Sequence, residues 1–517
     1  MSSRTPQDSP PPPARSELGR AARGGAITFV GAASSAALGF TFSLLLARLF
    51  GPTDAGVVLQ SVALFTIAVS VARLGTDTTA VWLLPRLRTQ SPHLVPAAIT
   101  LLLTATASAG AVLALVWYVV GAVRPSDDPV REVVDAIAWL LPVASGLAVA
   151  LACTRAFGGI VAFNLVDNVL VPAVRPLALV VAHLLGAAAL GAALGWALPV
   201  VLGAGAIGVV LHRHLRRLRR SLPANASPSA STGGREVPRW PDRQMRRTVA
   251  AYAVPRTFAA AMEQSIVWIG VLLVGMLLDD AAAGVYGSAA RFVAAGVVVA
   301  TALRIVVAPR FSALLGQGRT SEVGELYVVT ARWILLFGAP VYLTLAFFAP
   351  TVLAWLGEGF GSGARAMTIL CAGSVVVLAA GNVQALLLMS GRSGWGALNK
   401  AVVLAVNVVG MVLWVPSGGI EAAAAVWALS MLLDTVLASV QVRRATGIAL
   451  SWTSVLRVGL AVTACVALPA WAVTASWGQG TAPLLVSIGL GATLLAGYVA
   501  WDRRTLHLTE LVQMVRR

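Results

Sequence analysis

Charged residues are scarce in this chain of 517 residues. They make up 11% of the sequence, whereas hydrophobic residues make up 58%, and the mean hydropathy is +0.83. A soluble domain of this composition would not have enough polar residues to cover its surface. Lysine is almost absent, with Lys400 the only example. The composition therefore predicts a polytopic membrane protein and leaves no room for a separate soluble catalytic domain.

Residues suited to metal or covalent chemistry are also few. The three cysteines, Cys153, Cys371 and Cys465, lie in apolar runs without a CxxC spacing, so neither a disulfide framework nor a metal site is indicated. The five histidines form no HExxH pattern, and no glycine-rich loop ends in Lys-Ser or Lys-Thr. We therefore expect no metal, no cofactor, no ATP-driven step and no enzymatic activity.

An arginine-rich stretch, residues 211–247, divides the chain near its middle. It contains ten arginines among prolines, glycines and serines, which predicts a solvated loop. Arginine-rich loops stay on the cytoplasmic side during membrane insertion, so this loop orients both flanking halves. The net charge of +17 comes mainly from such short loops, and we therefore expect no nucleic-acid binding.

Apolar segments of about 20 residues, long enough to cross a bilayer, recur on both sides of this loop. Six precede it and eight follow, and arginines fall in every second connection, which predicts that both termini are cytoplasmic. The predicted fold is an all-α polytopic membrane protein of about 14 transmembrane helices, with two parallel six-helix bundles around a central cavity plus two C-terminal helices. The expected parts are a disordered cytoplasmic tail (1–23), an N-terminal bundle (24–212), the basic loop (213–247), a C-terminal bundle (248–446) and two extra helices with a short tail (447–517).

An internal sequence repeat supports the prediction of two bundles. The sequence LFGPTDAGVV from Leu49 resembles LLDDAAAGVY from Leu277, which aligns Gly56 with Gly284. Both repeats begin from the cytoplasmic side, so we expect them to be parallel and related by an axis along the membrane normal. Such an arrangement suits rocking of one bundle against the other around a site between them.

Four stretches in this order resemble the Wzx-type polysaccharide flippases, within the superfamily that also holds multidrug exporters and the lipid II flippase. They are ARLFGPTDAGVVLQSVALFTIAVSVARLGTDTTAVWLLPRL (from Ala47), AAAGVYGSAARF (from Ala281), LLLMSGRSGWGALNKAVVLAVNVVG (ending at Gly410) and VPSGGIEAAAA (from Val415). The resemblance covers roughly Arg23 to Ile448. One departure is that the family often places an acidic residue in its seventh helix near the position of Gly270, whereas the only acid in this span is Glu263.

The resemblance implies a flippase of the bacterial plasma (inner) membrane that moves a polyprenyl-diphosphate-linked oligosaccharide to the outer leaflet, for cell-surface polysaccharide biosynthesis. Its partners would be this lipid-linked oligosaccharide, membrane lipids, and polysaccharide polymerase and ligase proteins. Three alternatives stay open: a cation-coupled multidrug exporter, a lipid II flippase, and a membrane glycosyltransferase or ligase. An exporter needs an acidic cavity, and an enzyme of that kind usually needs a larger external loop than residues 121–133 provide.

Ionisable residues at membrane depth are the candidate site, because they are costly to place there. Guanidinium groups match phosphate oxygens, so an arginine-lined cavity would suit a lipid diphosphate. The predicted substrate-binding residues are Arg73, Arg256, Arg291 and Arg304, and Asp77 and Glu263 are predicted to balance charge or couple an ion.

Several of these charges also have purely structural interpretations. Arg73 and Asp77 are four residues apart and would pair at a helix end. Asp167 and Arg175 flank Pro172 and would satisfy backbone groups of a kinked helix. Asp434 is predicted to be a buried partner in a helix-to-helix hydrogen bond.

Overall fold

The helices of this chain are those of a multi-pass membrane protein. The computed structural model describes residues 14–123, 127–221 and 242–503, and all regular secondary structure in these ranges is helical. Eleven helical segments of this part are long and apolar enough to cross a membrane. Two of them, Val30–Gln90 and Gly394–Thr446, are interrupted by a glycine and contain two spans each. Counting each of these two segments as two spans brings the eleven segments to thirteen spans. The 37-residue helix Asp280–Gly316 is the fourteenth, so the helices correspond to the fourteen spans predicted from the sequence.

The first half of the chain forms one lobe. Short 3₁₀ segments join α2 to α3 and α4 to α5, and a π-helical segment, η3, interrupts one of its spans. The elements are α1 (Ala14–Ala72), α2 (Thr76–Gln90), η1 (Pro92–Leu94), α3 (Val95–Val123), α4 (Pro129–Ile137), η2 (Ala138–Leu140), α5 (Leu141–Ala156), α6 (Ile160–Asn164), η3 (Leu165–Leu170), α7 (Val171–Leu184), α8 (Ala189–Ala197) and α9 (Pro199–Ser221).

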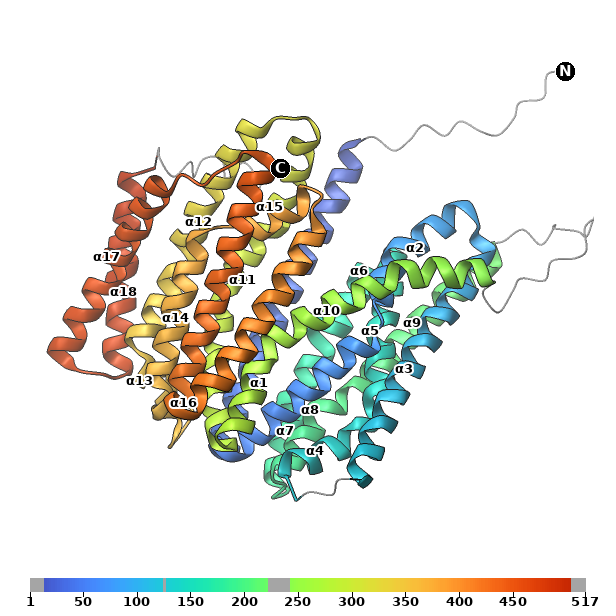
Figure 1. The fold of residues 1–517 in the computed structure, drawn as a ribbon, viewed down its shortest axis with the longest axis horizontal. Helices are drawn as coiled ribbons and strands as arrows, with labels where there is room; N and C mark the ends of the chain where they lie inside the picture. Colours follow the sequence, from blue (N-terminus) through green and yellow to red (C-terminus); the bar gives the residue numbers. More distant parts are fainter. Residues whose placement is uncertain (1–13, 124–126, 222–241, 504–517) are drawn as a thin grey trace, which may run out of the picture.

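The second half forms the other lobe and carries the two additional helices, α17 and α18, along its outer side (Figure 1). Large side chains such as Trp333, Tyr342 and Phe348 are fully buried in its core. Its elements are α10 (Arg243–Leu277), α11 (Asp280–Gly316), α12 (Thr320–Phe347), α13 (Ala349–Ala354), η4 (Phe360–Gly363), α14 (Ala364–Ala379), α15 (Val383–Met389), α16 (Ser393–Thr446), α17 (Trp452–Trp477) and α18 (Thr481–Trp501).

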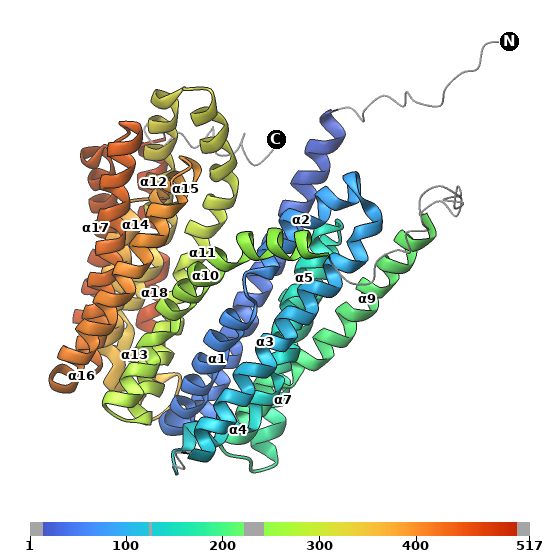
Figure 2. The ribbon, with the colours of Figure 1, turned by 45° about the vertical axis from the view of Figure 1, so that its right-hand side comes forward.

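The two lobes stand side by side with α1 between them, as Figures 1 and 2 show. α1 packs against α10 and α11 of the second lobe and against α7 of its own lobe. We call the end of the molecule at which α9 ends and α10 begins the basic end; it lies in the upper half of both figures. The opposite end holds the break in α1 at Gly51 and the turn between α10 and α11.

The polar segments are more helical than the sequence predicted. α1 begins at Ala14, within the expected tail 1–23, and α9 continues to Ser221, within the expected loop 213–247. Arginine and leucine are good helix formers, so a membrane-spanning helix can continue into water where its sequence is rich in these residues. α10 begins at Arg243 because the carboxylate of Asp242 accepts a hydrogen bond from the Met245 N–H and caps the helix. The rest of that loop, 222–241, and residues 1–13 lie outside the described residues.

Two glycines allow the chain to turn back between consecutive spans. Gly51 has φ 75° in α1, and Gly419 has φ 60° in α16. Both values lie in the left-handed region, which glycine adopts without steric cost. Pro52 and Pro416 stand close by and cannot donate a helical hydrogen bond. Each break therefore divides one long helical segment into two antiparallel limbs.

Polar pairs join the two limbs of α16 inside the second lobe. The only lysine, Lys400, places its Nζ 2.5 Å from Oδ2 of Asp434, whose side chain is 7% exposed. The prediction that Asp434 is a buried helix-to-helix partner is therefore confirmed. Amide and hydroxyl groups make two further links, Asn399 with Gln441 at 2.7 and 2.8 Å, and Asn407 with Ser430 at 3.3 Å.

A tyrosine satisfies the backbone where the span of α14 and α15 is broken. The hydroxyl of Tyr327 on α12 donates a 2.7 Å hydrogen bond to the carbonyl oxygen of Ala380, next to Gly381 with φ 62°. Both residues are buried, and a carbonyl freed by a helix break inside the membrane needs such a donor.

Replacing this tyrosine with phenylalanine should destabilise the protein. We expect Tyr327→Phe to lower the free energy of unfolding by about 1–2 kcal/mol, because it leaves a buried carbonyl without its donor. Denaturant titration in detergent micelles measures the change. The matched control is Tyr118→Phe, which removes an exposed hydroxyl that donates to the Asp135 carbonyl at 2.8 Å. Equal losses in the two variants would contradict this role for Tyr327.

Candidate functional site

A cavity of about 900 Å³ lies between the lobes. The second limb of α1 lines it from Leu59 to Arg73, and the first limb adds small residues such as Ser35. η3, α5, α7, α8 and α9 complete its wall in the first lobe, and α10 and α11 form its wall in the second lobe. Most of the lining is apolar or small. The charged side chains among its lining residues are Arg73, Asp167, Arg175 and Arg291.

Arg175 is held in place by a tryptophan of the neighbouring helix. Its guanidinium carbon lies 4.4 Å from the ring centroid of Trp196, and its Nε donates a 3.0 Å hydrogen bond to the carbonyl oxygen of Trp196. The interpretation that Arg175 satisfies its own kinked helix is therefore wrong, because the carbonyl that it binds belongs to α8. Stacking fixes the flat face of the guanidinium and leaves N–H groups on its edge for a ligand.

Arg291 has a similar setting in the other lobe. Its guanidinium carbon lies 4.1 Å from the ring centroid of Trp268, which is 7% exposed. Arg73 completes the set from the second limb of α1, and its Nε is buried without a hydrogen-bond partner among the described residues. A buried N–H without a partner is unfavourable, and the positive charge of Arg73 adds to that of the cavity wall.

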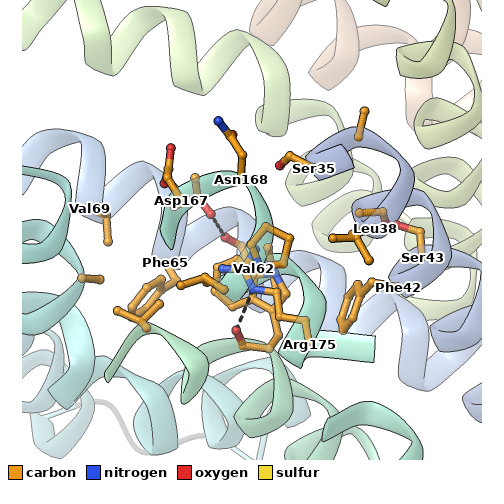
Figure 3. Close-up of a pocket in the computed structure, with 18 of the residues that line it drawn as sticks. Ser35, Leu38, Phe42, Ser43, Val62, Phe65, Val69, Asp167, Asn168 and Arg175 are labelled. Carbon is orange, nitrogen blue, oxygen red and sulfur yellow. Dashed lines mark hydrogen bonds between the residues drawn. The ribbon is translucent and has the colours of Figure 1, made fainter. Parts of the chain in front are cut away.

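The only carboxylate among the lining residues stands on a π-helical segment. η3 (Leu165–Leu170) joins α6 to α7, and its extra residue per turn reorients the side chains that follow. Figure 3 shows that Asp167 and Asn168 project from the same side of this segment. Asp167 is exposed within the cavity and lies near the positive charges of Arg73 and Arg175. Its charge offsets part of theirs when no ligand is bound.

The cavity gathers two of the four predicted arginines. Arg73 and Arg291 line it, whereas Arg256 and Arg304 are exposed elsewhere on α10 and α11. Gln264 lines the cavity, but its neighbour Glu263 does not.

Asp77 also stays outside the cavity. Its Oδ1 accepts a hydrogen bond from the N–H of Thr78 at 2.7 Å. The chain breaks at Leu74 and Gly75, both with positive φ, so Arg73 and Asp77 do not share a helix face. The interpretation of these two residues as a helical pair is therefore wrong.

Sequence reasoning missed Arg175 and Asp167 as site residues. Their signal was weak, since both flank a proline and had a structural explanation. The useful clue was the presence of Trp196 and Trp268 at the depth of the arginines, because a tryptophan face is a preferred support for a guanidinium group.

Packing explains why an acidic residue is absent at position 270. A side chain at Gly270 would meet the hydroxyl of Tyr286 at 3.0 Å and Met411 at 3.3 Å. The space that an acid would need is therefore already filled by a tyrosine, and position 270 contributes no charge to the cavity.

The charges of the cavity suit an anion. Three arginines and one aspartate leave an excess of two positive charges among the lining side chains. Charges at membrane depth are costly unless a partner or a ligand compensates them. Guanidinium groups line the cavity from both lobes, and the apolar remainder of the wall accepts hydrophobic surface. The arrangement fits a multivalent, amphipathic anion.

No family model and no curated protein sequence matches this chain. Solved structures do match its fold. The lipid II flippase MurJ in an inward closed conformation aligns with 92% of this chain and 99% of its own, at a TM-score of 0.70 and 11% identity. The chain has the fold of MurJ and the MATE transporters.

Two further structures share this fold. A multidrug resistance MATE family transporter of the MOP superfamily, in an inward-facing conformation, matches at a TM-score of 0.62 and 13% identity, covering 80% of this chain and 94% of its own. A MOP superfamily transporter from Pyrococcus furiosus matches at 0.55 and 14% identity, covering 84% and 95%. At these identities the likeness shows the fold alone.

Proposed function

We propose that the protein is a flippase that moves a polyprenyl-diphosphate-linked oligosaccharide across the bacterial plasma membrane by alternating access, for cell-surface polysaccharide biosynthesis. The observation that carries the proposal is the cavity between the lobes, where Arg73, Arg175 and Arg291 outnumber Asp167. A diphosphate carries the multiple negative charges that this set needs, and guanidinium forks fit its oxygens.

The proposed orientation places the basic end in the cytoplasm. Arginines concentrate at the helix ends there, and positive loops remain on the cytoplasmic side of bacterial membranes. Both termini are then cytoplasmic, and the lipid-linked oligosaccharide enters where it is made. After release on the outer side, polysaccharide polymerase and ligase proteins are the partners that would consume it.

A multidrug exporter is the weaker candidate because its ligands are cationic. The excess of positive charge among the cavity residues repels them, and Asp167 is the only carboxylate that lines this cavity in the described part of the chain. A lipid II flippase is the second candidate, favoured by the extent of the match to MurJ. Lipid II also carries a diphosphate, so the cavity suits both substrates and the two proposals differ in the glycan.

The test is to deplete the protein in its host and identify which lipid-linked intermediate accumulates on the cytoplasmic leaflet. We expect a polyprenyl-diphosphate oligosaccharide to build up, and wild-type protein but not Arg291→Ala to relieve it. Accumulation of lipid II instead would select the second candidate. Sensitivity to cationic dyes with no accumulated intermediate would overturn the flippase proposal in favour of the exporter.

A further inference from the structure

The repeat-related glycines meet each other where the lobes are joined. A methyl group built on Gly56 would overlap the carbonyl oxygen of Asp280 and lie 2.9 Å from the backbone nitrogen of Gly284. A methyl on Gly284 would overlap the carbonyl oxygen of Pro52 and lie 2.9 Å from the nitrogen of Gly56. Each glycine therefore packs on the carbonyl four residues before the other, and neither position has room for one more carbon.

A side-chain hydrogen bond lies beside this backbone contact. Nε2 of Gln60, one turn after Gly56, donates to Oδ1 of Asp280 at 2.6 Å. Gln60 is 3% exposed, and a methyl on Gly275 of α10 would overlap its side chain, so the amide is enclosed by the second lobe. The two glycines, Gln60 and Asp280 form a contact between the lobes that we call the seam.

The seam lies at one end of the cavity. The second limb of α1 lines the cavity from Leu59 to Arg73, toward the basic end, while Gly56 lies beyond Leu59 toward the opposite end. α11 begins at Asp280 in the seam and reaches the cavity with Arg291. The same pair of helices therefore carries both the seam and the wall of the cavity.

We propose that the seam is the outer gate of the transporter, closed in this structure by the Gly56–Gly284 contact and by the hydrogen bond from Gln60 to Asp280. The inference rests on the proposed alternating-access function. Because the contact is made by backbone atoms without side chains, the lobes close against each other over a very short distance. Opening the cavity to the outside must break the glycine contact and this hydrogen bond together.

A single added methyl group should therefore hold the gate open. The assay uses a variant in which Cys153, Cys371 and Cys465 are replaced by alanine and the cavity residue Ser35 is replaced by cysteine. A membrane-impermeant thiol reagent is added to intact cells, and the rate at which it labels Ser35→Cys is measured. We expect slow labelling with an intact seam and an increase of about tenfold or more with Gly56→Ala or Gly284→Ala, because closure would require atomic overlap.

Two further variants make the result specific. Gly208→Ala lies on α9, outside the seam and the cavity lining, where a methyl meets nothing within 4 Å, and it should leave the labelling rate unchanged. Gln60→Glu adds no volume but places a second carboxylate beside Asp280, so it should also raise labelling through repulsion of like charges. This isosteric variant decides the question if either alanine variant does not fold.

Slow labelling in folded Gly56→Ala, Gly284→Ala and Gln60→Glu would overturn the gate. Fast external labelling of the protein with an intact seam would also overturn it, because the open end of the cavity would then face outward. The assay requires no substrate. If the protein shows the expected labelling but flips no lipid-linked glycan, the gate proposal stands and the proposed substrate is wrong.

Discussion

Replacing Arg175 or Arg291 with alanine is expected to lower the transport of a lipid diphosphate by about 10- to 100-fold. Each variant removes a charge-assisted, fork-shaped contact of about 1.5–3 kcal/mol. Both side chains reach the cavity from a tryptophan face, one in each lobe. Lysine at either position keeps the charge but loses the planar fork, so it should recover only part of the activity. Initial flipping rates in proteoliposomes, measured against substrate concentration, give the loss.

Arg256→Ala and Arg304→Ala are the matched controls. They remove arginines of α10 and α11 that are exposed and do not line the cavity. We expect their flipping rates to remain within about twofold of wild type. If these two variants lose transport while Arg175→Ala and Arg291→Ala retain it, the substrate path does not run through the cavity described above.

Replacing Lys400 with methionine is expected to lower the free energy of unfolding by about 3–5 kcal/mol. The buried carboxyl group of Asp434 would then lack the ammonium group that lies 2.5 Å away. Oδ1 of Asp434 has no hydrogen-bond partner among the described residues, so it cannot compensate for the loss. Denaturant titration in detergent micelles measures the change.

The double variant Lys400→Met with Asp434→Leu should regain most of this stability, because a buried ion pair can be replaced by apolar residues at little cost. Arg319→Ala provides the comparison at an exposed ion pair, where Arg319 and Glu322 have side chains that are 52% and 45% exposed. We expect that variant to cost about 0–1 kcal/mol. A loss in Lys400→Met no greater than this would show that the buried pair does not stabilise the fold.

The fold was largely predictable because a bilayer restricts what a chain can do. Spans must be helical and about 20 residues long, and positive loops mark alternate connections, so hydropathy and arginine positions define the helices. The helix boundaries in polar segments were less predictable. Arginine favours both a solvated loop and a helix that extends into water, and the sequence of 211–221 does not distinguish the two.

The site was only partly predictable because depth in a membrane does not define a helix face. In a soluble protein the apolar stripe of a helix marks the core, but lipid-facing and packed faces are both apolar here. Arg291 and Arg304 share α11 and both looked suitable, yet only Arg291 lines the cavity. The role of Arg175 could not be predicted without knowing how α8 packs, because its stacking partner Trp196 comes from that helix.

The contact of Gly56 with Gly284 has the geometry of an isologous dimer interface. In a homodimer with two-fold symmetry, a residue close to the axis touches its own copy. Here the two copies belong to one chain and to matching positions of its two repeats. A duplicated and fused six-helix subunit would inherit this contact from a dimer, and each half would constrain the other. A larger residue at one glycine cannot be accommodated by shrinking the other, because glycine has no side chain to give up.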